Sequence, residues 1–330
     1  MPSISVLMPV FNAERYVREA IESILNQTYK DFELIVLNDA STDKSKEIIL
    51  SFKDPRIVYL ENEKNGGLSF SRNRLLAEAK GEFIAWLDAD DIAYSERLQE
   101  EVSFLQNHQD HAMVAGWARL VNSAGEPTGD FIKSFIPNKY LSALLLFVNY
   151  FVQSSVMIRK SCLPEIHYKP DFPPTEDYEL WVRIAANYPV AILPKILVDY
   201  RIHTNNISSV QQQRSEQTVK LNHRLQLQNL GLVPDEDEIN LHYHIAFRKA
   251  DDMTFLQQTE TWLQKISNQN KVSKRFDTQA LNYILAHRWL KVCTSNKALG
   301  MKALSIYFRS SFASISFKNI FLLGKYILKG

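Results

Sequence analysis

The sequence predicts an α/β fold in which a mostly parallel sheet carries helices on both faces and is followed by a helical C-terminal region. Strand-like and helix-like patterns alternate over the first 200 residues, as in chains that build parallel sheets. One predicted strand, residues 82–87, stops in a run of carboxylates, and open α/β sheets bind their ligands at the carboxyl ends of strands. From about residue 211 onward the strand patterns disappear.

The first third of the chain is the most regular. Residues 4–11 form the apolar run of a buried strand, and apolar side chains then recur at helical spacing over residues 16–25. Asp43 suits the N-terminal end of a helix, and Gly81 suits a helix C-terminus. The expected elements up to residue 107 are strands over 4–11, 32–37, 56–60 and 82–87, and helices over 16–25, 43–53, 70–80 and 95–107.

The pattern continues more loosely beyond the acidic run. Residues 123–129 are rich in turn-forming residues and predict a loop between two elements. The remaining elements expected before residue 205 are strands over 113–121, 154–159 and 196–200, and helices over 140–150 and 177–188. This continued alternation extends the α/β domain to about residue 210.

The chain divides into two parts of opposite charge. We place the boundary in residues 205–209, between an α/β domain over 1–210 and a helical region over 211–330. The first part carries 21 basic and 28 acidic residues, a net charge of −7, and the second carries 17 and 9, a net charge of +8. The last thirty residues, 301–330, hold five basic residues and no acid, interleaved with aromatic side chains. This composition favours an interfacial helix on an anionic membrane leaflet over a nucleic-acid-binding role; a C-terminal helix docked on the domain is the alternative.

The overall composition is that of a soluble globular protein. The 330 residues are 45% apolar and 23% charged, enough to bury a sizeable core. Cys162 and Cys293 lie far apart and share no metal-ligand spacing, so we expect inert thiols in a reducing cytoplasm. We see neither a secretion signal at the N-terminus nor a long uncharged apolar run, and expect no membrane-spanning segment.

The acidic run Asp88-Ala89-Asp90-Asp91 is the strongest single indication of chemistry. Several carboxylates at one sheet edge cost folding energy unless a cation offsets their charge. A divalent metal with oxygen ligands is the simplest such cation, and a common reason to hold one there is to bind a diphosphate. A solvated loop with a helix-capping Asp is the alternative.

Short motifs follow one another over residues 3–210. They are Ser5-Val6-Leu7-Met8-Pro9-Val10-Phe11-Asn12, Asn26-Gln27-Thr28-Tyr29, Asn38-Asp39-Ala40-Ser41-Thr42-Asp43, Gly67-Leu68-Ser69-Phe70-Ser71-Arg72-Asn73, the acidic run, Glu176-Asp177 and Tyr200-Arg201-Ile202-His203. In type and order these motifs resemble those of family 2 inverting glycosyltransferases, which have the GT-A fold, a Rossmann-like sheet flanked by helices. The last motif and the basic C-terminal region further resemble bacterial lipooligosaccharide and O-antigen transferases, notably the β-1,3-N-acetylglucosaminyltransferases.

The resemblance implies a UDP-sugar donor site. Asp39 would accept a hydrogen bond from N3–H of uracil, and the backbone of Pro9, Val10 and Phe11 would border the same base. Arg72 would contact the diphosphate or the uracil, because its fork matches anionic and planar partners. Purely structural roles stay open for both side chains: a turn-forming or helix-capping Asp39, and a surface ion pair for Arg72.

The resemblance also divides the work within the acidic run. Asp88 would bind the ribose, with Ala89 beside the nucleotide, and Asp90 would ligate Mn²⁺ or Mg²⁺ between the two phosphates. His203 is the second expected metal ligand, through a neutral imidazole compatible with Mn²⁺. A structural histidine at a strand end is the alternative.

An inverting transfer needs one base, and we predict that it is Asp177. Glu176 would be its partner or a sugar contact, and Trp181, four residues beyond Asp177 on the same helical face, would floor the sugar site or lie in the core. Ordinary acids at a helix N-terminus are the alternative for the Glu176-Asp177 pair.

The predicted function is thus a metal-dependent inverting transfer of a sugar, GlcNAc before Gal or GalNAc, from a UDP-sugar to a saccharide or lipid-linked glycan acceptor. A loop over residues 123–138 would order on donor binding as a lid, and the enzyme would lie on the inner face of the cytoplasmic membrane. The alternatives are a non-catalytic sugar- or nucleotide-binding protein and a nucleotidyltransferase.

Overall fold

The computed structural model describes residues 2–163, 167–204, 211–247, 250 and 252–313. Within them the chain forms two compact units, residues 1–139 with 149–218, and residues 140–148 with 219–330. Segment 140–148, which the sequence pattern assigned to the α/β domain, thus belongs to the second unit. The predicted boundary at 205–209 lies outside the described residues.

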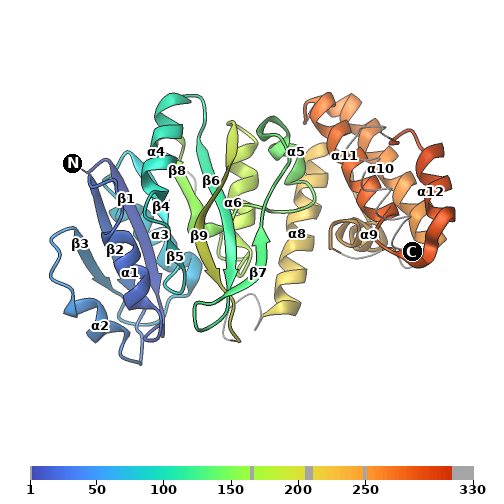
Figure 1. Cartoon of the computed structure of the whole chain (residues 1–330). Helices are drawn as coiled ribbons and strands as arrows, with labels where there is room; N and C mark the ends of the chain where they lie inside the picture. The colour runs from blue at the N-terminus through green and yellow to red at the C-terminus, as the bar shows by residue number, and fades with distance from the viewer. Residues whose placement is uncertain (1, 164–166, 205–210, 248–249, 251, 314–330) are drawn as a thin grey trace. The chain divides into compact units, whose positions relative to one another are not determined.

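The first unit contains one sheet of nine strands among its described residues (Figure 1). The strands are β1 (Ile4–Val10), β2 (Phe32–Asn38), β3 (Ile57–Glu61), β4 (Phe83–Trp86), β5 (Ile92–Ala93), β6 (Met113–Val121), β7 (Pro127–Ile132), β8 (Val156–Arg159) and β9 (Val190–Arg201). Their order is β3-β2-β1-β4-β8-β6-β9-β5, with β7 paired to β6.

The predicted α/β class is confirmed, and the sheet is mixed. β1 pairs in parallel with both β2 and β4, β2 with β3, and β6 with β9. β8 inserts antiparallel between β4 and β6, β7 returns from β6 as a hairpin, and β5 runs against β9. The expected parallel pairing therefore holds through β1 to β4, whereas β8, β7 and β5 each pair antiparallel with their neighbours.

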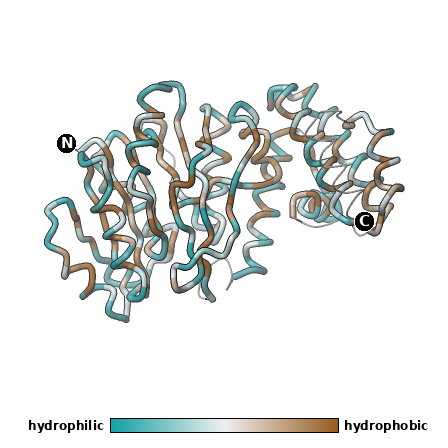
Figure 2. Tube along the Cα trace, viewed as in Figure 1, coloured by the Kyte–Doolittle hydropathy of each residue, from teal (hydrophilic) through white to brown (hydrophobic). Residues whose placement is uncertain are grey.

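Helices cover both faces of this sheet. They are α1 (Val17–Leu25), α2 (Ser45–Ser51), α3 (Leu68–Glu78), α4 (Arg97–Asn107) and α6 (Glu176–Ala185). Apolar residues of α1, α2 and α4 join one face of β1, β2 and β4 in a single buried cluster, while α3 packs on the other face of β1 and β2. Figure 2 shows much of the hydrophobic colour on the strands, as expected for strands buried on both faces.

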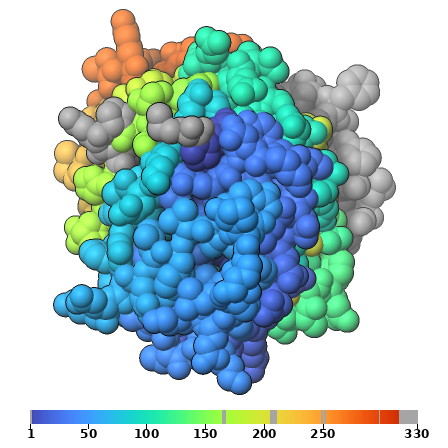
Figure 3. Space-filling view, turned by 90° about the vertical axis from the view of Figure 1, so that its left-hand side faces the viewer, coloured from blue at the N-terminus to red at the C-terminus, as the bar shows by residue number. Residues whose placement is uncertain are grey.

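The edge strand β3 is only partly buried. Figure 3 views the molecule from the side on which β3 and α2 lie in Figure 1, and residues from the first hundred form most of the surface there.

The second unit is helical in its described part. Its helices are α5 (Leu141–Leu144), α9 (Glu236–Phe247), α10 (Met253–Ser273), α11 (Thr278–Cys293) and α12 (Gly300–Arg309), together with most of α8 (Gln212–Leu230). This agrees with the predicted loss of strands after residue 211. No helix in the described parts of the chain is both long and apolar enough to cross a membrane.

Two predicted segments differ from the structure. Residues 127–132 form strand β7 rather than a loop, because they pair with Ala118 to Val121 of β6. The helix expected over 140–150 is shorter: α5 ends at Leu144, and residues 145–147 form turns.

Candidate active site

The segments that follow β1, β2 and β4 lie side by side at one edge of the sheet. Because these strands are parallel neighbours, their carboxyl ends meet there. The backbone N–H of Asp39 donates to the carbonyl of Val10 at 2.8 Å, which ties the end of β2 to the end of β1. The predicted base-binding residues Pro9, Val10, Phe11 and Asp39 are thus brought together by the topology.

Asp39 is buried, and its carboxylate organises the loop in front of α3. It accepts hydrogen bonds from Asn62 Nδ2 at 2.5 Å and from the backbone N–H of Gly66 at 2.9 Å and Gly67 at 3.1 Å. A carboxylate offers about four lone-pair sites, so one further donor can still bind. Phe11, whose side chain is 50% exposed, is the aromatic residue that follows β1.

Arg72 lies on α3 and is 4% exposed, so it is not the surface ion pair considered from the sequence. Its guanidinium donates to the Glu176 carboxylate and, at 3.1 Å, to Asp88 Oδ1. Burial alone would lower the pKa of Arg72, but the charges of Asp88 and Glu176 raise it. The arginine therefore links the acidic run after β4 to the start of α6.

The members of the acidic run face different surroundings. Asp88 and Asp90 are partly exposed, Ala89 is nearly buried, and Asp91 is 1% exposed. Asp91 accepts from the Ser154 hydroxyl and, at 2.8 Å, from the Arg201 backbone N–H, and Ser154 Oγ also accepts from the Asp88 N–H. Burial and the charges of Asp90 and Asp88 raise the pKa of Asp91 well above its usual range. Asp91 thus fixes the run to β9, whereas Asp88 and Asp90 keep part of their surface exposed.

His203 lies against Asp90, as the predicted metal pair requires. Its Nε2 is 3.0 Å from Asp90 Oδ2, and its ring centroid is 5.0 Å from that of Tyr16. Arg201, two residues earlier, donates from Nε to the Asp90 carbonyl at 2.8 Å and from Nη2 to Glu19 at 2.6 Å. Arg201 thus connects the backbone of Asp90 to Glu19 of α1.

The donor set of this pair fits a divalent metal completed by a substrate. One carboxylate and one imidazole suit Mn²⁺, and Mg²⁺ commonly takes one or two carboxylates together with substrate phosphates. Within the described residues no three His, Cys, Asp or Glu side chains form a ready-made metal site. A metal held by Asp90 and His203 would therefore need oxygens from a ligand or water.

Asp177 and Glu176 lie in the first turn of α6, after a loop with a cis peptide between Pro173 and Pro174. Glu176 is 1% exposed and bound by Arg72. Asp177 is partly buried, and it accepts from the N–H of Tyr178 at 2.7 Å. Burial and the charge of Glu176 raise the pKa of Asp177 to about 7, against the opposing charge of Arg72. A carboxyl with this pKa can exchange a proton near neutral pH.

Of the two positions predicted for Trp181, the structure has the one in the core. Its side chain is 0% exposed, so it is a core residue of α6 and does not line a sugar site. The helical face that carries Asp177 turns inward one turn later, where packing against the sheet decides the environment of the side chain.

The structure adds residues that the sequence patterns did not single out. Asn62 holds Asp39, Ser154 holds the acidic run, and Asn149 reaches Asp177. Each comes from a loop or a short helical turn without a periodic signal. For Asn62 the available sequence signal was its place shortly before Gly66 and Gly67, whose backbone N–H groups bind the same carboxylate of Asp39.

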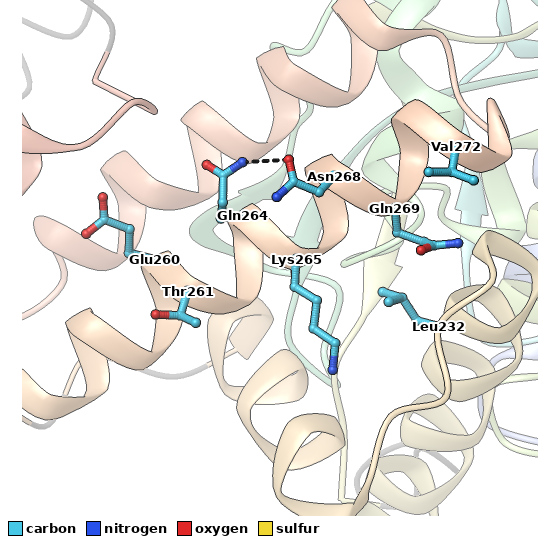
Figure 4. Close-up of a pocket in the computed structure, with 8 residues that line it drawn as sticks. All are labelled: Leu232, Glu260, Thr261, Gln264, Lys265, Asn268, Gln269 and Val272. Carbon is cyan, nitrogen blue, oxygen red and sulfur yellow. Dashed lines mark hydrogen bonds between the residues drawn. The ribbon is translucent and has the colours of Figure 1, made fainter.

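A separate groove lies in the second unit and contains none of the predicted site residues (Figure 4). Its lining is the polar face of α10 with one leucine: Leu232, Glu260, Thr261, Gln264, Lys265, Asn268, Gln269 and Val272. Lys265 is already paired with Glu238, and Gln264 donates to Asn268 at 3.0 Å.

Comparisons with known proteins bear on this site. A family model described as "Glycosyl transferase family 2" matches residues 5–162. An uncharacterized glycosyltransferase of Methanocaldococcus jannaschii is 35% identical over 224 residues, covering 64% of this chain and 76% of that one.

Two solved structures share the fold. The S. aureus TarS fragment 1–349 in complex with UDP-GlcNAc has a TM-score of 0.57 at 18% identity, covering 92% of this chain and 88% of that one. The mannosyltransferase PcManGT from Pyrobaculum calidifontis, in complex with GDP-Man and Mn²⁺, has a TM-score of 0.55 at 14% identity, covering 99% and 88%. These matches confirm the predicted GT-A fold.

Proposed function

Because the chain belongs to glycosyl transferase family 2, we propose that this sugar-transferring enzyme uses a UDP-sugar donor and forms a β-linkage with inversion. The observation that carries the proposal is the convergence of Asp39, the acidic run, His203 and Asp177 around one edge of the sheet. GlcNAc is the first candidate sugar, before Gal or GalNAc. The TarS fragment, a structural neighbour, binds UDP-GlcNAc.

The nucleotide would occupy the ends of β1, β2 and β4. Asp39 keeps one acceptor position for N3–H of uracil, which favours uracil over cytosine, whose N3 bears no proton. The backbone of Pro9 to Phe11 would border the base, and Asp88 would bind the ribose beside Ala89. Arg72 would hold Asp88 in place through its hydrogen bond and would not contact the diphosphate directly.

Asp90 and His203 would hold Mn²⁺ or Mg²⁺ at the diphosphate. When bound, the ion would neutralise the charge that develops on the departing UDP. Arg201 keeps the Asp90 backbone in position for this task through its 2.8 Å hydrogen bond.

Asp177 would be the base of the transfer. The acceptor hydroxyl oxygen attacks the anomeric carbon while the bond from that carbon to the UDP oxygen breaks, and the hydroxyl proton passes to the Asp177 carboxylate. Attack opposite the leaving group converts an α-linked donor into a β-linked product. The pKa of about 7 suits Asp177 to this exchange.

We further propose that the acceptor is a saccharide or lipid-linked glycan of a bacterial surface polymer, as in the lipooligosaccharide and O-antigen transferases. The enzyme would act in the cytoplasm, at the anionic inner face of the membrane. The described start of its basic end supports this, because Met301 and Phe308 of α12 are 72% and 55% exposed. Residues 314–330 lie outside the described part of the chain.

The test is UDP release from UDP-GlcNAc, UDP-GalNAc, UDP-Gal and UDP-Glc, each with Mn²⁺ and without acceptor. We expect slow hydrolysis of one donor, and that donor names the sugar. UDP-binding calorimetry on the same samples separates a binding protein, which would bind UDP but release none from any donor, from a misfolded preparation.

A further inference from the structure

Asn149 reaches the proposed base from a different part of the chain. Its Nδ2 lies 3.5 Å from Asp177 Oδ2, and its Oδ1 accepts the backbone N–H of Phe151 at 2.8 Å. Because a backbone N–H can only donate, the second contact fixes the amide so that its oxygen faces Phe151 and its N–H₂ faces Asp177. Hydrogen bonds to catalytic groups are often long before substrate binds and shorten in the complex.

The charged groups around Asp177 show why a neutral donor matters at this position. The charged groups acting on it are Glu176 beside it, Asp88 across the site and the Arg72 guanidinium. Arg72 donates to Glu176 and Asp88. Its charge therefore reaches Asp177 from a distance, whereas Asn149 offers a neutral donor directly to the carboxylate oxygen.

We propose that Asn149 is a positioning residue for Asp177, set in place by the hydrogen bond that it accepts from the Phe151 backbone N–H. This inference rests on the proposed function, because it needs Asp177 to be the base. By donating to the ionised carboxylate, Asn149 orients Oδ2 and favours the form that accepts a proton.

The direct test is Asn149→Ser, assayed by the pH dependence of kcat/KM for UDP release. Serine can still accept the N–H two residues ahead and keep the turn, but it loses the donor to Asp177. We expect the acid limb of the profile to move up by about half to one pH unit, kcat to fall about three- to tenfold, and UDP affinity to stay unchanged.

The matched control is Asn122→Ser. Asn122 makes the same kind of turn, with Oδ1 accepting from the Ala124 N–H at 2.9 Å and Nδ2 donating to Glu126 at 2.9 Å, but it lies in the β6–β7 hairpin. Its variant should keep the wild-type profile. An acid limb in Asn149→Ser that coincides with the wild type would overturn the proposal. If Asn149→Ser does not fold, Asn149→Ala, checked by UDP calorimetry, decides the question by the same readout.

Absence of UDP release from every donor in the wild type would instead count against the proposed function.

Discussion

Single residues set the proton chemistry of this site. Asp177 would ordinarily be ionised far below neutral pH, but burial and the neighbouring Glu176 raise its pKa to about 7. The Glu176 carboxylate is held in the interior by its ion pair with Arg72. The site thus holds two adjacent carboxylates in different roles, one bound in an ion pair and one able to take a proton.

The first prediction concerns the pH profile of the wild type. A base must be ionised to accept a proton, so activity should fall as the pH drops through the pKa of Asp177. We expect the acid limb of kcat/KM near pH 7. The measurement is UDP release at constant ionic strength from pH 5.5 to 9, values chosen to span about 1.5 units or more on either side. An acid limb near pH 4 would speak against Asp177.

The second prediction concerns removal of this base. Asp177→Asn should lower kcat by about 10² to 10⁴, because the amide cannot accept the hydroxyl proton, while UDP affinity stays within a factor of about two. Asp171→Asn, on the exposed loop before α6, is the control and should keep full activity. Steady-state kinetics with calorimetry of UDP binding gives both quantities. Equal loss in the two variants would show that the effect is not specific to the base.

Within the second unit, α8 and α9 depend on histidines that must stay neutral. His242 contacts the Leu146 carbonyl through Nε2 and accepts the Trp262 indole N–H at Nδ1, at 3.0 Å. A proton on Nδ1 would oppose the indole N–H, and burial lowers the pKa of His242 to about 4. Both contacts of His242 therefore require the neutral imidazole.

A third prediction follows for stability against pH. His242 takes up a proton below about pH 6.5 in the unfolded chain but only below about pH 4 in the folded protein. The contribution of neutral His242 to the free energy of unfolding is therefore fully present above about pH 6.5 and decreases as the pH falls toward 4. The full effect amounts to about 3 kcal/mol. The urea midpoint should drop between pH 7.5 and 5, and His242→Leu should reduce that drop. The exposed His108→Gln variant should retain it.

Some strands and helices of this fold could be predicted from the sequence and others could not. Strands β1, β2 and β4 were predictable because they are apolar runs bounded by polar residues, and their shared edge followed from the parallel arrangement. β7 was not, because its exposed residues lack alternation and its Gly and Pro indicate a loop. α5 was overestimated because the apolar residues that follow it look helical, whereas residues 145–147 form turns.

The site as a whole joins residues that lie far apart in the chain. The residue types at Asp39, Asp90, His203 and Asp177 could be named from the sequence, because motifs of the family carry them. Their pairings could not. Asp90 meets His203 across 113 positions and Arg72 meets Glu176 across 104, and such contacts depend on the topology of the whole sheet. For the same reason the burial of Trp181 was beyond a local pattern.

The whole chain also has a charge asymmetry that bears on where it works. We predict that it sediments with anionic phosphatidylglycerol vesicles and not with neutral phosphatidylcholine vesicles, and that added salt weakens this binding. Replacing the basic residues of 301–330 (Lys302, Arg309, Lys318, Lys325 and Lys329) by Gln should abolish it. The control replaces five lysines within residues 30–80. Binding that survives the first change and is lost in the second would contradict this assignment.

The proposed sugar transfer depends on a metal ion held by Asp90 and His203. This dependence is tested by UDP release from the preferred UDP-sugar with Mn²⁺ and with chelator, in the wild type and in Asp90→Asn. We predict that chelator abolishes release by the wild type, that Mn²⁺ restores it, and that Asp90→Asn remains about 10² or more slower at saturating Mn²⁺. Release that proceeds equally with chelator, or an Asp90→Asn variant as fast as the wild type, would show that the transfer does not use a metal held by Asp90.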